Sequence, residues 1–251
     1  MNRLLLTHES FPSPDAMDVA VSHAILRAVS EGRLEGVFRL HVPSPVVAFG
    51  RADRAAPEYR DAVQAAESHG FAAVERLAGG RAAVFHQATL AFSWVVPLPE
   101  PRAGIEGRFE LTAGLMTNAF RSLGIDARVG ELPGEYCPGA WSVNVGGEAK
   151  VMGVGQRLVR GAAHIGGVVV VGEADRIRDV LVPVYRALGL DWDPATAGAL
   201  ADWNPELDTG IVAEAIIESF RTRFDLQEGT LPPFVAERAS SLVPDHLPRV
   251  A

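Results

Sequence analysis

Two residue types are almost missing from this chain of 251 residues, which has a single cysteine, Cys137, and a single lysine, Lys150. One cysteine excludes an internal disulfide framework and any Cys-x-x-Cys metal site. All other basic residues are arginines, and a guanidinium cannot replace an ammonium where a compact charge or a deprotonatable amine is required. A lone cysteine is nevertheless usually a small buried hydrophobe, so composition alone favours a structural role for the pair.

The chain also lacks long apolar runs. No stretch reaches the ~18 to 20 residues that a membrane span requires, and the first nine residues become polar too early for a signal peptide. The 48% of hydrophobic and 22% of charged residues are typical of a folded globular protein rather than a disordered one. We therefore expect a cytoplasmic protein without a membrane partner.

Positive charge is scarce as well. The net charge of -8 argues against a nucleic-acid partner, because the phosphate backbone attracts a positive surface. It is compatible with a small-molecule or protein partner. The seven histidines show no HxxxH or HExxH spacing, so we expect no helical zinc site and no bound metal.

Apolar periodicity predicts helices alternating with groups of short strands. Ser13 is expected to cap the first helix with Pro14 in its first turn, Thr209 to cap a later one, and Pro183 to kink another. Helices are expected at 14–31, 57–69, 108–123, 173–188, 209–224 and 232–242. Strands are expected at 37–42, 46–50, 71–77, 82–86, 90–96, 141–145, from 148 onward, and at 165–171.

Strands joined largely by hairpins, with helices grouped around them, favour an α+β layer fold over strict βαβ alternation. The pattern contains no internal repeat and no linker. We expect one domain over residues 1–251, in which the helices at about 209–251 form a C-terminal extension rather than a separate accessory domain.

The first stretch with chemical character is 76–86, which reads Arg-Leu-Ala-Gly-Gly-Arg-Ala-Ala-Val-Phe-His. Gly79 and Gly80 mark a turn with unusual dihedrals. A strand that follows such a turn and ends in His86 lets backbone N–H groups face a ligand carbonyl or phosphate. The stretch is neither a P-loop nor a GxGxxG motif. Taken alone, it is explained more simply as a tight turn with a solvent-exposed histidine.

The second stretch runs from Cys137 through the hairpin turn at 146–147 to Lys-Val-Met-Gly-Val-Gly-Gln-Arg at 150–157. Gly153 and Gly155 lie inside its second strand, where glycine often marks the close approach of a ligand. Together the two stretches resemble the lipoate/biotin protein ligase and octanoyltransferase superfamily. Its members combine a strand-turn of arginine, glycines and histidine with a later strand that begins with lysine.

The resemblance implies an α+β fold of the class II aminoacyl-tRNA synthetase and biotin–lipoate ligase type, with a mixed, mostly antiparallel sheet flanked by helices. It implies Cys137 and Lys150 as catalytic residues. The substrate-binding positions that it implies are Arg76, Gly79, Gly80, Arg81, His86, Gly153, Gly155 and Gln156. Arg81 resembles the cysteine-bearing octanoyltransferases, because lipoate ligases usually have a third glycine at that position.

Three positions depart from the family pattern. The early Met-Ala-x-Asp-Glu segment appears only loosely at 16–20, and the usual acidic residue after the histidine is Gln87. The usual His-Gly before the last core strand is Gly166-Gly167, with His164 displaced by two positions. A paralogue with an altered substrate would carry such changes.

By resemblance, we expect an octanoyltransferase in which the Cys137 thiolate takes a medium-chain acyl group as a thioester. The donor would be acyl carrier protein or another lipoyl carrier. The acceptor would be a lysine of a lipoyl-domain protein, such as the glycine cleavage H protein or the E2 subunit of a 2-oxoacid dehydrogenase. Lys150 would stabilise the thiolate or, with N–H groups at 79–81, the carbonyl oxygen.

His86 would line the carbonyl end of the acyl tunnel or transfer protons. The expected apolar lining of the tunnel is Val84, Val151, Val154 and Val168. Two alternatives stay open. An ATP-dependent lipoate-protein ligase would use ATP and Mg, with Lys150 at the acyl-adenylate and Cys137 incidental, whereas a non-catalytic paralogue would bind an octanoyl, lipoyl or biotinyl group without transferring it. The transferase itself needs no cofactor, and we expect a monomer.

Overall fold

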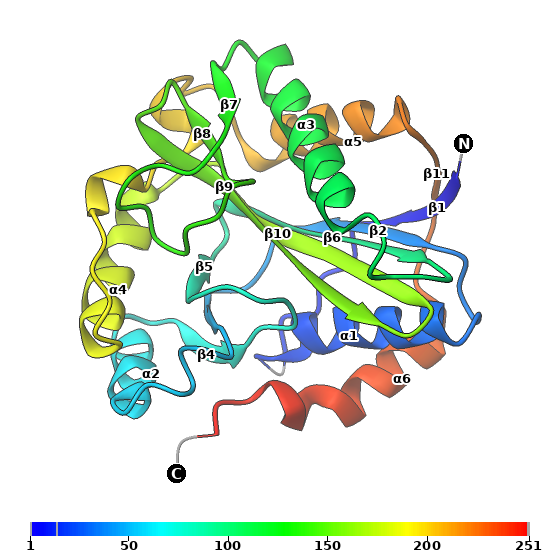
Figure 1. Ribbon diagram of the computed structural model, residues 1–251, viewed down its shortest axis with the longest axis horizontal. Coiled ribbons are helices and arrows are strands. Elements are labelled where there is room, and N and C mark those ends of the chain that lie inside the picture. Colours follow the sequence, from blue (N-terminus) through cyan, green and yellow to red (C-terminus); the bar gives the residue numbers. More distant parts are fainter. Residues whose placement is uncertain (1, 14, 250–251) are drawn as a thin grey trace.

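The computed structural model describes residues 2–13 and 15–249, and within them the main sheet has eight strands in the order β11-β1-β2-β6-β10-β9-β8-β7 (Figure 1). β1 pairs in parallel with β2 and β11, and the other neighbouring pairs are antiparallel. The prediction of a mixed, mostly antiparallel sheet is confirmed. The strands are β1 (Asn2–Thr7), β2 (Val37–His41), β6 (Thr89–Pro97), β7 (Ala127–Val129), β8 (Val143–Val145), β9 (Ala149–Val159), β10 (Ala162–Val170) and β11 (Phe224–Glu228).

A smaller sheet lies beside the main one, in the order β4-β3-β5. It consists of β3 (Val46–Phe49), β4 (Ala72–Glu75) and β5 (Ala83–Phe85). Helices α2 (Tyr59–Ser68) and α4 (Ala174–Ala187) share a buried apolar cluster with this sheet. The Gly79–Gly80 turn connects β4 to β5, so the smaller sheet carries the first of the two motif stretches.

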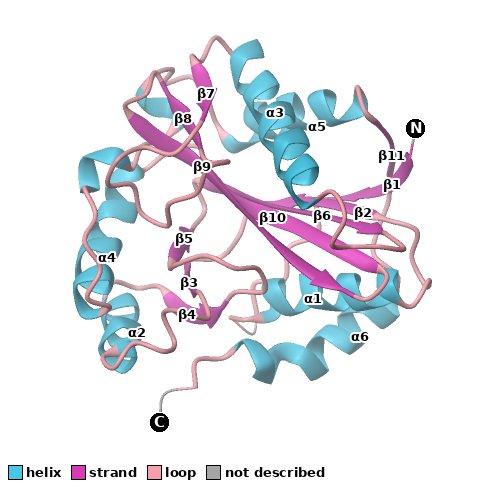
Figure 2. Cartoon of the chain, viewed as in Figure 1, coloured by secondary structure: helices cyan, strands magenta, loops and turns pink. Residues whose placement is uncertain are grey.

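Helices cover both faces of the main sheet, as Figure 2 shows. α3 (Ile105–Ser122) and α5 (Thr209–Arg221) lie on one face, and α1 (Met17–Ser30) and α6 (Pro233–Leu242) on the other. Short 3-10 turns occur at Pro194–Thr196, Leu200–Asp202 and Val243–His246. Of the helices in the described parts of the chain, none is long and apolar enough to cross a membrane.

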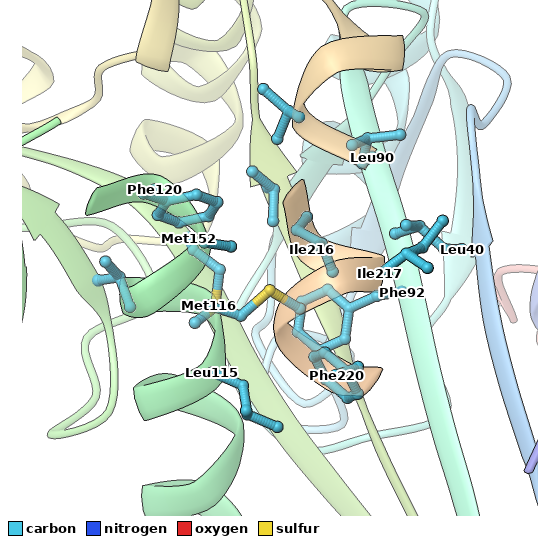
Figure 3. Close-up of a cluster of buried hydrophobic side chains, with 14 of the residues drawn as sticks. Leu40, Leu90, Phe92, Leu115, Met116, Phe120, Met152, Ile216, Ile217 and Phe220 are labelled. Atoms are coloured by element: carbon cyan, nitrogen blue, oxygen red, sulfur yellow. The ribbon is translucent and has the colours of Figure 1, made fainter. Parts of the chain in front are cut away.

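The two faces follow from the period-two alternation of side chains along a strand. Phe92 in β6 belongs to the same buried cluster as Phe120 of α3 and Phe220 of α5, as the close-up in Figure 3 shows. Val95, three positions later, packs in the cluster that α1 contributes to on the opposite face. Each face of the sheet therefore has its own core.

The sequence-based prediction lacks β1 and β11, at one end of the main sheet, and the short edge strand β7 at the other end. The helix predicted at 209–224 ends at Arg221, and Phe224 begins β11, which pairs with β1. These strands come from opposite ends of the chain and each is stabilised by the other. A local pattern gives little sign of such a pairing.

The predicted helix caps also need correction. α1 has Ala16 at its N-cap rather than Ser13, and Pro14 lies outside the described residues. α5 is capped by Asp208, one residue before the predicted Thr209, because the Asp208 carboxylate accepts the N–H of the third helical residue at 2.8 Å. An aspartate in this position satisfies a backbone donor that the first turn of a helix leaves unpaired.

Candidate active site

The sulfur of Cys137 lies against the Gly79–Gly80 turn, so the structure brings the two motif stretches together. The backbone N–H of Arg81 donates to Sγ at 3.1 Å, and Nη1 of Arg76 lies 3.7 Å from it. Nη1 of Arg76 also donates to the carbonyl of Arg81 at 2.9 Å. Gly80 has φ of +114°, and a Cβ there would lie only 2.9 Å from Sγ. The second glycine is therefore required by both its backbone conformation and the cysteine.

The backbone of Cys137 has φ of +43°, a left-handed conformation that costs a non-glycine residue about 1 to 2 kcal/mol. Neighbouring groups hold it there. The Tyr185 hydroxyl accepts the Cys137 N–H at 2.9 Å and donates to the carbonyl of Ala82 at 3.0 Å. Burial raises the pKa of Tyr185 well above its usual value, so this hydroxyl keeps its proton. Strain held in this way is typical of functional positions.

Lys150 is almost fully buried, with 1% of its surface exposed. Its Nζ donates to the Glu135 carboxylate at 2.9 Å, to the carbonyl of Tyr136 at 3.0 Å and to that of Cys137 at 2.7 Å. These three bonds use the three donors of an ammonium. A guanidinium is larger and planar and does not fit three acceptors gathered around one nitrogen. This geometry explains why a lysine stands at this position in an arginine-rich chain.

The contact expected between Lys150 and the thiolate requires correction. Nζ bonds the carbonyl oxygen of Cys137, while the cationic side chain in contact with the sulfur is Arg76. The reason is Glu135, whose carboxylate attracts the ammonium into the protein and away from the sulfur. Lys150 thus holds the loop that carries Cys137.

A cavity of about 430 Å³ opens at the sulfur. The predicted positions that line it are Arg76, Gly79, Gly80, Cys137, Lys150, Gly153, Gly155 and Gln156. Apolar walls are provided by Phe85, Phe109, Trp141, Val154, Leu158 and Val168. A Cβ on Gly155 would lie 3.0 Å from the carbonyl oxygen of Gly79, so the glycine permits the two stretches to approach each other.

Other predicted residues lie elsewhere. The side chain of Arg81 pairs with Asp53 at 3.3 Å, so this residue meets the sulfur only through its backbone. Val84 and Val151 belong to buried clusters away from the cavity. Gln156, by contrast, does line the cavity, and its amide donates to the carbonyl of Ile105 at 2.8 Å and accepts from Arg108 at 3.0 Å.

His86 lies outside the cavity, so its expected position at the acyl carbonyl is not observed. In β5, Ala83 and Phe85 line the cavity, and alternation turns the intervening and following side chains away from it. The His86 ring is buried and its Nδ1 accepts the N–H of Ala88 at 3.2 Å. Burial, and then the nearby Arg176, lowers its pKa to about 4, which leaves a neutral ring at neutral pH.

Two supporting residues, Glu135 and Tyr185, are absent from the sequence-based prediction. Besides Lys150, the Glu135 carboxylate accepts the hydroxyl of Ser142 at 2.6 Å and the N–H of Leu132 at 3.0 Å. Glu135 lies two residues before the cysteine, and the signal in the sequence is an acidic residue in the same segment as the single lysine. Tyr185 lies in α4, far along the chain, and no local pattern marks it.

Comparison with solved structures places this fold among the lipoate-protein ligases. A lipoate-protein ligase A solved with ATP superposes with a TM-score of 0.78 at 21% identity, over 96% of this chain and 94% of the other. A bi-partite lipoate protein ligase from Thermoplasma acidophilum gives a TM-score of 0.76 at 21% identity, over 97% and 93%. At these identities the likeness concerns the fold alone. The chain belongs to the lipoyl protein ligase A/B catalytic domain family, whose sequence pattern matches residues 14–221.

Relatives with assigned activities are octanoyl-GcvH:protein N-octanoyltransferases. The one from Geobacillus kaustophilus is 31% identical over 170 residues, which are 68% of this chain and 60% of the relative. The one from Bacillus velezensis is 24% identical over 210 residues, which are 83% and 71% of the two chains. The chain thus spans less than two thirds of the length of the Geobacillus protein.

Proposed function

We propose that this protein is a cysteine acyltransferase that moves a medium-chain acyl group between carrier proteins through a thioester on Cys137. The observation that carries the proposal is the sulfur itself, held at a cavity wall by the Arg81 N–H and the Arg76 guanidinium. The sulfur thus faces a hydrogen-bond donor and a cation at the wall of a cavity, which is where a cysteine nucleophile is placed in enzymes that form acyl thioesters. The octanoyltransferase relatives support the same chemistry.

In the first step Sγ attacks the acyl carbonyl carbon and a C–S bond forms. The carbonyl electron pair moves to oxygen, and the donors beside the sulfur that can stabilise it are the Arg81 N–H and the Arg76 guanidinium, with a contribution of ~3 kcal/mol per well-placed donor. The bond from carbon to the donor's leaving atom then breaks. The leaving group takes up a proton, which balances the proton lost by the thiol.

In the second step the lysine amine of an acceptor domain attacks the thioester carbon. A C–N bond forms, the C–S bond breaks and the thiolate is released, while the attacking amine loses a proton. When the donor is also a lysine amide, one amide replaces another and no ATP is consumed. The role proposed for Lys150 is to hold the backbone next to the sulfur in place. Its ammonium already donates to the carbonyls of Tyr136 and Cys137, so these donors are not free for the reacting group.

The names of the relatives support a GcvH-type lipoyl carrier as donor and a second lipoyl-domain protein as acceptor. Acyl carrier protein is the other donor that the chemistry accepts, with a thiol as leaving group. With the lipoyl carrier the bond that breaks is a lysine amide, and with acyl carrier protein it is a thioester. Each donor can be supplied to the protein in a separate assay.

The test is the intact mass of the protein after incubation with octanoyl-GcvH and, separately, with octanoyl-acyl carrier protein. We expect a mass increase of one octanoyl group that hydroxylamine removes, that Cys137→Ser lacks, and that disappears when an unmodified lipoyl domain is added. Formation of an acylated lipoyl domain only when free octanoate and ATP are supplied would overturn the proposal in favour of a ligase. Binding of the acyl group without transfer under either condition would indicate a non-catalytic carrier.

A further inference from the structure

A second cavity of about 90 Å³ adjoins the one at the cysteine, and the two share Arg76, Phe85 and Gly167 as walls. It lies between the start of α1, the smaller sheet and strands β2, β6 and β10 of the main sheet. With the acyl carbonyl placed at the sulfur, a chain that continues past these shared walls would meet the groups of the second cavity beyond its carbonyl.

Three polar side chains of the main sheet line this cavity, namely His41, Ser93 and His164. Strand register places the three side chains on one face of the sheet. Ser93 lies opposite Arg39 on one side and Gly166 on the other. His41 and His164 are each two positions from these residues along their own strands, and side chains two positions apart share a face. A Cβ on Gly166 would lie 2.6 Å from the His164 ring, so the glycine leaves the space that the ring occupies. The exposed fractions of His41, Ser93 and His164 are 6%, 3% and 5%.

Four buried polar atoms of these side chains have no hydrogen-bond partner within residues 2–13 and 15–249. Both ring nitrogens of His41, Oγ of Ser93 and Nδ1 of His164 are buried and make no hydrogen bond there. The Asp18 carboxylate lies 3.5 Å from His41 Nε2, but it already pairs with Arg39 and accepts a backbone N–H. Buried polar groups are nearly always hydrogen-bonded. Their gathering on one cavity indicates a ligand that supplies the missing partners.

Charges around the cavity determine which polar group fits. Burial, and then the Arg39 guanidinium, holds the pKa of His41 well below its usual value, and burial with Arg76 lowers that of His164 to about 4. Both rings are therefore neutral, with one donor and one acceptor nitrogen each. A carboxylate in the cavity would lie beside Asp18, and an ammonium beside Arg76. A neutral group that both donates and accepts matches the lining.

We propose that the acyl chain handled by this protein bears a neutral hydrogen-bonding group of the hydroxyl class on its distal half, and that His41, Ser93 and His164 select it. This inference rests on the proposed function only in placing the acyl carbonyl at Cys137. An unsubstituted octanoyl tail would displace water from these polar atoms and leave them unpaired. Sites that hydrogen-bond a substrate hydroxyl discriminate strongly against the analogue that lacks it.

The test is a calorimetric titration of the Cys137→Ser protein with octanoic acid and with ω-hydroxyoctanoic acid. We expect the hydroxy acid to bind about tenfold more tightly, which corresponds to a net gain of one to two hydrogen bonds. Ser93→Ala removes one partner at nearly constant volume and should reduce the preference to about threefold or less. Thr117→Val is the matched control, because it also removes a buried hydroxyl without a partner among the described residues, but outside this cavity.

Equal binding of the two acids, or tighter binding of octanoic acid, overturns the inference. So does an unchanged preference in both Ser93→Ala and His41→Phe, because the selecting groups would then be elsewhere. Absence of binding by either acid also overturns it. None of these results decides whether Cys137 is acylated, since the protein titrated lacks the nucleophile. The proposed function is tested separately by the intact mass of the unmodified sequence.

Discussion

The buried ion pair of Glu135 and Lys150 is the interaction whose loss we expect to damage the site most. The carboxylate accepts from Nζ at 2.9 Å, from the Ser142 hydroxyl at 2.6 Å and from the Leu132 N–H at 3.0 Å. In Glu135→Gln one oxygen becomes an amide NH₂, so at least one of these donors faces another donor. The ammonium also loses the opposite charge that offsets its burial.

The magnitude follows from what the glutamine retains. Removing one partner of a buried ion pair typically costs 3–5 kcal/mol. Glutamine keeps the shape and one acceptor, and Nζ keeps the carbonyls of Tyr136 and Cys137, so we expect the lower end, about 3 kcal/mol. The loosened loop displaces the sulfur, and a displacement of about 1 Å lowers a reaction rate about 100-fold.

Urea unfolding measures the loss of stability, and mass spectrometry of the octanoyl adduct measures the rate of Cys137 acylation. Glu131→Gln is the matched control, because it makes the same chemical change on an exposed residue of the same loop. We expect it to alter stability by less than about 0.5 kcal/mol. A loss below about 1 kcal/mol in Glu135→Gln, together with an unchanged acylation rate, refutes the reasoning.

Three further predictions concern single positions. Lys150→Arg keeps the charge but places a planar guanidinium in an enclosed site with 1% exposure, so we expect at least a 100-fold loss of acylation, and normal turnover would remove the requirement for an ammonium. Gly80→Ala places a Cβ 2.9 Å from Sγ at φ of +114°, whereas a Cβ on Gly79 meets nothing within 4 Å; acylation assays should show a large loss in the first variant only, and equal effects would contradict the packing argument. Because the pKa of His164 is lowered from 6.5 to about 4, the unfolded chain binds the proton more tightly, and the free energy of unfolding should fall by about 3 kcal/mol as the pH decreases from about 6.5 to about 4. His164→Phe should remove that part of the pH dependence, and parallel curves for the two proteins would disprove the assignment.

The sequence predicts most helices and strands because their apolar periodicity matches a buried face. β1 and β11 are different, since β11 joins the sheet by pairing with β1, which itself pairs with β2, and the two strands come from opposite ends of the chain. The sequence also predicts correctly that the two motif stretches belong to one site, and the reason is again packing. Gly80 and Gly155 are glycines because something else occupies the space of a side chain, and that requirement is visible in the sequence.

The roles of charged groups are harder to predict, because they depend on which atoms meet. The scarcity of lysine marks Lys150 correctly as unusual, but its bond to the Cys137 carbonyl rather than to the sulfur depends on where Glu135 lies. His86 belongs to the recognised motif, yet strand alternation turns it away from the cavity. Applied to 83–86, the period-two rule could have excluded it.

The groups that contact Cys137 come from three separate parts of the chain. Arg76 and the Arg81 N–H belong to the β4–β5 turn, Tyr185 belongs to α4, and Lys150 belongs to β9. No local segment contains all of these contacts. The rate at which the single cysteine reacts with a thiol reagent should therefore report the completeness of the tertiary structure, because a partly folded chain would lack the contacts that hold this residue in place.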